Sequence, residues 1–178
     1  MRTRQNKITT RTAALGAMLC ALGVVLVYLG AITDILDLSL CAVACLIVIF
    51  ARIEVGKGFA YLVYAASALL SLVLCPQKFS AAAYAFMALY AVLKADIERL
   101  GRLLSWILKL AYFNLALTGA ICAAKYLFAV PDLGSVPVWF VLGNVTFVLF
   151  DIALTKLITL YIIKFRQRLK IDKFLRKL

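Results

Sequence analysis

Six apolar stretches alternate with short polar or charged breaks along the chain. The stretches cover residues 12–32, 38–53, 58–75, 79–95, 103–129 and 137–164. A membrane-spanning helix needs about 20 mainly apolar residues. The breaks contain turn-forming residues and charges, as in Gly56-Lys57-Gly58 and Pro76-Gln77-Lys78. The pattern therefore predicts an all-α fold, an integral membrane bundle of six transmembrane helices.

The composition leaves little room for a soluble domain. Apolar residues make up 66% of the 178 residues, against about 45–50% in soluble domains. We expect one transmembrane domain over residues 1–165 and a basic cytoplasmic tail over residues 166–178. From Lys164 onward, basic residues are interleaved with Phe, Leu and Ile, which is typical of an amphipathic helix lying on an anionic membrane surface.

Positive charge falls mainly on one predicted side of the membrane. Most of the 20 Lys and Arg residues lie near the two termini and in the second and fourth breaks, whereas Lys78 and Lys125 fall on the other side. The positive-inside rule then predicts a multi-pass protein of the cell membrane with both termini in the cytoplasm. This asymmetry accounts for the net charge of +12, so nucleic acid is not an expected partner.

The first apolar stretch carries small residues on one half of its helical wheel. Ala13, Gly16, Ala17 and Ala21 lie there with Cys20 and Gly23, and Val24 is the only larger side chain among them. Small residues let two membrane helices approach closely. We therefore expect Ala13, Gly16, Ala17 and Ala21 to form an interface with a partner helix. The alternative is that this half packs against a neighbouring span of the same chain.

Several kinds of chemistry find no support in the sequence. The chain has no histidine, and its five cysteines lie in apolar stretches without CxxC spacing, so we expect no metal site and no cofactor. We find no nucleophile paired with a base, no pair of carboxylates at the membrane surface and no glycine-rich phosphate loop. The protein is therefore not expected to be an enzyme.

Polar residues form two stripes on the last two predicted spans. Asn144, Asp151 and Thr155 share one face of the sixth, and Asn114, Thr118 and Lys125 share one face of the fifth. From helix rise, we expect Asn114 and Thr118 at the depth of Asp151, and Lys125 at the depth of Asn144.

Ionisable groups at membrane depth usually mark function or a structural partner. We therefore predict a substrate-binding cavity formed by Asn114, Thr118, Lys125, Asn144 and Asp151, supplemented by Tyr84. The alternative is that these groups hydrogen-bond between helices and bind nothing.

The architecture resembles a known family of transport proteins. Thr10-Arg11-Thr12 leads into a first helix with Ala13, Ala17 and Ala21 at AxxxA spacing, in a six-span chain of under 200 residues. This is similar to the substrate-binding S components of energy-coupling-factor (ECF) transporters. The resemblance implies a partner-docking first helix, a transmembrane coupling subunit and two ATPase subunits. It also implies capture of a small polar molecule, such as a vitamin or its precursor, from outside.

Two other classes stay open. One is a small integral membrane scaffold of the cell-envelope machinery, similar to the rod-shape determinant MreD and without transport activity. The other is a membrane-embedded enzyme acting on lipid, which the few acidic residues and the missing histidine disfavour.

Overall fold

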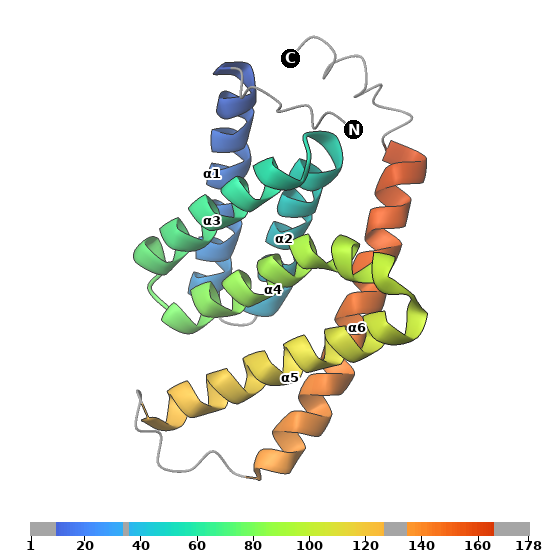
Figure 1. The fold of residues 1–178 in the computed structure, drawn as a ribbon. Coiled ribbons are helices and arrows are strands. Elements are labelled where there is room, and N and C mark those ends of the chain that lie inside the picture. The colour runs from blue at the N-terminus through green and yellow to red at the C-terminus, as the bar shows by residue number, and fades with distance from the viewer. Residues whose placement is uncertain (1–9, 34–35, 127–134, 166–178) are drawn as a thin grey trace. The chain divides into compact units, whose positions relative to one another are not determined.

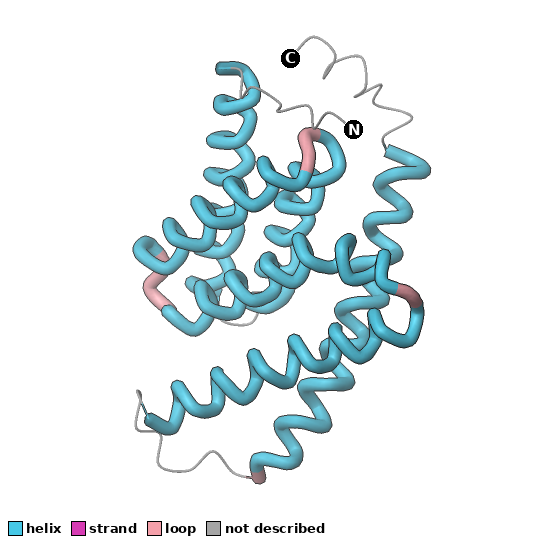
Figure 2. Tube along the Cα trace, in the orientation of Figure 1, coloured by secondary structure: helices cyan, strands magenta, loops and turns pink. Residues whose placement is uncertain are grey.

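The computed structural model describes residues 10–33, 36–126 and 135–165, and within these ranges it contains helices and no strand (Figure 1). The α-helices are α1 (Thr10–Thr33), α2 (Asp37–Glu54), α3 (Lys57–Leu74), α4 (Lys78–Ile97), α5 (Arg102–Tyr126) and α6 (Val136–Leu160). A 3₁₀ helix, η1 (Glu98–Leu100), follows α4, and a π-helix, η2 (Tyr161–Phe165), follows α6. The described connections are short (Figure 2). The all-α expectation is confirmed for the described residues.

Five of the described helical segments are long and apolar enough to cross a membrane. They are Thr12–Thr33, Lys57–Leu74, Lys78–Leu100, Leu103–Cys122 and Pro137–Ile163. α2 is not among them, because Asp37, Arg52 and Glu54 all fall within its 18 residues. The structure therefore supports a membrane location. A sixth span and cytoplasmic termini stay predictions, and the expected tail helix over residues 166–178 lies outside the described residues.

The contacts divide the described chain into two compact units. Unit 1 contains the residues up to Val92 together with η2, and unit 2 contains Leu93–Leu160. Each unit is described by itself below.

Small residues set the spacing of the helices in unit 1. α1 packs against α2 and α3, and α2 also packs against α3. At Gly30, an added Cβ would lie 3.3 Å from both the Cα and the carbonyl oxygen of Asp37. At Gly23, it would lie 3.6 Å from the Tyr84 hydroxyl oxygen of α4. Gly30 therefore lets α1 lie directly against the backbone that starts α2, whereas the distance at Gly23 is an ordinary van der Waals contact.

A buried carboxylate links α2 to α4 within unit 1. The Ser80 hydroxyl donates to Asp37 Oδ2 at 2.7 Å, and the Cys41 thiol donates to Asp37 Oδ1 at 3.7 Å. Asp37 lies in the first turn of α2, where the helix dipole favours negative charge. Nearby, Lys78 Nζ donates to the carbonyls of Leu72 and Cys75 at 2.9 and 3.1 Å, which satisfies groups left open at the end of α3.

The π-helix η2 is fixed to α2 by one residue. The Tyr161 hydroxyl donates to Glu54 Oε1 at 2.9 Å, and its ring meets Phe50 edge-on with centroids 5.7 Å apart. These contacts explain why η2 belongs to unit 1 although α6 belongs to unit 2.

The accessibility of the cysteines to a thiol reagent tests the packing of unit 1 directly. Cys20, Cys41, Cys45 and Cys75 are buried, whereas Cys122 is exposed. Burial also raises the pKa of the Cys75 thiol, which lowers its thiolate fraction. We expect a maleimide to label only Cys122 in the folded protein in mild detergent, and all five cysteines after denaturation, as counted by mass spectrometry. Labelling that persists in Cys122→Ser would contradict the closed core of unit 1.

Candidate functional site

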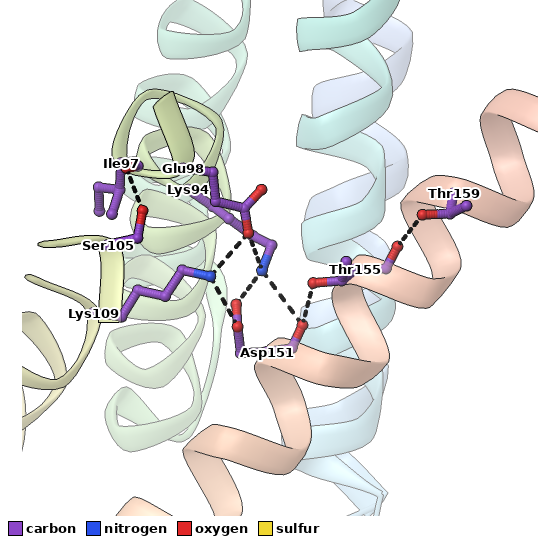
Figure 3. Close-up of polar contacts among 8 residues, drawn as sticks. All are labelled: Lys94, Ile97, Glu98, Ser105, Lys109, Asp151, Thr155 and Thr159. Atoms are coloured by element: carbon purple, nitrogen blue, oxygen red, sulfur yellow. Dashed lines mark hydrogen bonds and ion pairs between the residues drawn. The ribbon is translucent and has the colours of Figure 1, made fainter. Parts of the chain in front are cut away.

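Four charged side chains form a compact cluster inside unit 2 (Figure 3). Asp151 of α6 accepts from both lysines, with Oδ1 paired to Lys94 of α4 and Oδ2 lying 2.9 Å from Lys109 Nζ of α5. Glu98 of η1 completes the cluster, because its Oε1 lies 2.9 Å from Lys94 Nζ and 2.8 Å from Lys109 Nζ. Two cations and two anions therefore balance each other.

The charged side chains of this cluster are buried and therefore need partners of opposite charge. The side chains of Lys94, Lys109 and Asp151 are only 2%, 6% and 4% exposed. A charge removed from water is costly unless an opposite charge and hydrogen bonds replace the solvent. Lys94 meets this requirement further by donating to the Asp151 backbone carbonyl at 3.4 Å. The cluster thus joins α4, η1, α5 and α6 through electrostatics rather than through apolar packing alone.

A second polar contact joins α5 and α6 away from the charges. The amide nitrogen of Asn114 donates to Asn144 Oδ1 at 3.1 Å, and the amide nitrogen of Asn144 donates to Asn114 Oδ1 at 3.0 Å. Each side-chain amide also donates to a carbonyl of its own helix, Leu110 or Phe140. Both N–H donors of each amide are therefore used.

The register of α5 and α6 differs from the sequence expectation. Asn114 was predicted to lie at the depth of Asp151, but it pairs with Asn144, and Lys109 is the α5 residue that meets Asp151. Phe113 stacks on Phe147 between these two contacts, with ring centroids 4.6 Å apart. The three contacts follow an antiparallel order. The difference has a physical cause, because Asp151 requires a cation and the reciprocal amide pair satisfies both asparagines.

The other predicted binding residues lie in different surroundings. Thr118 is exposed, and its hydroxyl donates to the Asn114 carbonyl at 2.7 Å. The side chain of Lys125 lies outside the described residues. Tyr84 belongs to unit 1, where its hydroxyl is buried and lies 2.8 Å from Ser67 Oγ. Unit 2 thus brings together Asn114 with Asn144, and Asp151 with two lysines that the predicted site did not include.

The small half of α1 separates into two faces. An added Cβ at Gly16 would lie 2.9 Å from the Phe59 ring of α3, so this residue serves a contact within unit 1. Ala13, Ala17 and Ala21 are exposed in unit 1. Gly16 therefore follows the alternative of packing within the chain, and a partner-helix interface at Ala13, Ala17 and Ala21 stays a prediction.

Sequence reasoning missed Lys94 and Glu98 as members of the cluster. They are four residues apart on successive helical segments, a spacing that favours an ion pair. That spacing was the available signal, together with the need of Asp151 for a partner from another helix. Among the described residues, no group of three or more His, Cys, Asp or Glu side chains is placed to hold a metal ion.

Comparisons with known proteins gave no match to a family model and no significant match to a curated protein or a solved structure.

The difference in burial predicts that Asp151 and Glu98 contribute unequally to the stability of the protein. Asp151→Asn removes the buried carboxylate that both lysines share, so we expect it to lower the free energy of unfolding by about 3–5 kcal/mol. Glu98→Gln also removes a carboxylate from both lysines, but the Glu98 side chain is 42% exposed, so water can replace part of the lost interaction and we expect a smaller loss than for Asp151→Asn. Unfolding titrations in detergent micelles measure both values.

A double variant that removes one anion and one cation tests whether Asp151 stabilises the protein through charge balance. Asp151→Asn combined with Lys109→Met leaves Lys94 and Glu98 as a balanced pair, so we expect partial recovery of stability. Wild-type stability of Asp151→Asn alone would show that Asp151 is not a structural partner of the lysines.

Proposed function

We propose that this chain is a membrane-embedded subunit that docks onto a partner membrane protein through α1, in the manner of the S components of ECF transporters. The observation that carries the proposal is the division of small residues on α1. Gly16 and Gly23 contact other helices of unit 1, whereas Ala13, Ala17 and Ala21 are exposed at AxxxA spacing. Small residues that are not needed for internal packing support close approach of another helix.

In this proposal the partner is a transmembrane coupling subunit that acts with two ATPase subunits. The chain itself captures a small polar molecule from outside, and the coupling subunit carries the free energy of ATP hydrolysis to it. Asn114, Asn144 and Asp151 supply hydrogen-bonding groups on α5 and α6 for that molecule. Their present partners are each other and the lysines, so binding requires the ligand to replace these contacts.

A second candidate function is a membrane scaffold that docks onto a partner without transporting anything. The observation that favours it is that the predicted binding groups of unit 2 hydrogen-bond or pair with one another. Such closed polar contacts serve helix association equally well. The two candidates share the α1 interface and differ in the ligand and in the ATPases.

The α1 interface can be tested with one substitution and a matched control. Ala17→Leu places a branched side chain in the exposed stripe, so we expect co-purification of the partner to fall about tenfold or more, which corresponds to about 1.4 kcal/mol. Met18→Leu alters the neighbouring residue, which is 75% exposed, and should leave co-purification unchanged. Native mass spectrometry of the protein from mild detergent measures bound subunits and bound small molecules together.

The outcomes distinguish the candidate functions. A bound coupling subunit, two ATPases and a small molecule support the S-component proposal. A bound membrane protein without ATPases or small molecule supports the scaffold. Equal co-purification of a partner with Ala17→Leu and with the wild type would refute docking through this stripe.

A further inference from the structure

The members of the charged cluster of unit 2 differ in exposure. Lys94, Lys109 and Asp151 are almost fully buried, whereas the Glu98 side chain is 42% exposed. Glu98 is therefore the member of the cluster that is most accessible to another molecule. In Figure 3 the Glu98 carboxylate lies beside both ammonium groups, from η1.

The two lysines converge on a single acceptor position. Lys94 Nζ and Lys109 Nζ donate to the same oxygen, Glu98 Oε1, at 2.9 and 2.8 Å. Two ammonium groups around one anionic oxygen form charge-assisted hydrogen bonds, the strong kind that carboxylates and phosphates also accept. The position occupied by Glu98 Oε1 therefore fits an oxygen of either group.

Glu98 is also the member that can leave at the lowest cost. It begins a 3₁₀ helix of only three residues, and Gly101 follows with φ of 98°. Short 3₁₀ segments have poorer hydrogen-bond geometry than α-helices and commonly serve as connectors. Water competes for the exposed Glu98 carboxylate, so its ion pairs contribute less than those of the buried Asp151 carboxylate. Asp151, in contrast, stays with the lysines because it is buried within α6.

We propose that Lys94 and Lys109 form a binding site for an anionic group, a carboxylate or a phosphate, and that Glu98 fills this site until a ligand displaces it. The incoming anion takes the place of Glu98 Oε1, and the Glu98 side chain turns toward its exposed side. The charge of the cluster is then balanced by the ligand. This site does not involve the α1 interface, and phosphate binding to the isolated protein tests it without any partner subunit.

Trp106 supplies a reporter for the site in the intact protein. Lys109 Nζ lies 5.4 Å from the centre of the Trp106 ring, and the chain has one other tryptophan, Trp139. In a Trp139→Phe parent, fluorescence comes from Trp106 alone. We expect inorganic phosphate, titrated in neutral detergent at constant ionic strength, to produce a saturable change as the lysine partner changes.

The variants assign that change to the cluster. Glu98→Gln removes the competing carboxylate, so we expect the phosphate concentration at half-saturation to fall about tenfold. Glu54→Gln is the matched control, since Glu54 accepts a hydrogen bond from Tyr161 elsewhere, and it should match the parent. Lys109→Gln should abolish saturation, whereas Lys109→Arg, which keeps the charge, should retain it.

Nanodiscs separate the two sources of such an anion. If phosphatidic acid in a phosphatidylcholine bilayer suppresses the phosphate response, a lipid headgroup fills the site. If the response is equal in both bilayers, a soluble anion fills it. The proposal is overturned if Glu98→Gln shows no saturable response, or if Glu98→Gln and Glu54→Gln respond alike. Because Glu98 is exposed, this comparison holds even if Lys109→Gln fails to fold.

Discussion

The Asp151 carboxylate is the group on which the structure of unit 2 depends. It is buried near the middle of a long apolar helix, so it requires cations, and α4 and α5 each supply one. Lys109 then fixes which residue of α5 faces Asp151, and this register brings Phe113 onto Phe147 and Asn114 onto Asn144. Lipid tails give no hydrophobic force that would hold two helices together. Interhelical hydrogen bonds and ion pairs therefore help packing to fix the register of α5 and α6.

The helices of unit 1 are held together by different contacts from those of unit 2. Its helices approach through glycine, alanine and cysteine, and the buried polar residues in its described part are Asp37 and three serines, Ser67, Ser71 and Ser80. Asp37 needs no cation beside it, because it lies at the start of α2 and accepts from Ser80. Close approach of backbones therefore organises unit 1, whereas paired charges organise unit 2.

The sequence predicted the helices well because hydrophobic length and turn residues are local signals. Each predicted stretch overlaps one α-helix of the described chain. The α5–α6 register was not predictable in this way. The predicted depths assumed that both helices begin and end level with each other, whereas the actual register follows from which side chains can satisfy Asp151. Lys94 and Glu98 were missed because they lie where the fourth apolar stretch ends, and charges at such a position are expected at a membrane boundary. Their burial became evident only with the partners in place.

The polar groups of unit 2 already have partners, and this limits where a ligand can bind favourably. Asn114, Asn144 and Asp151 already have hydrogen-bonding partners, so a ligand gains only the difference between its contacts and those it replaces. This difference is smallest where the existing partner is exposed and lies on a short segment. Glu98 is the cluster member that meets both conditions. The same pairing that stabilises unit 2 therefore directs binding toward the Glu98 side of the lysines, and away from the fully buried face of Asp151.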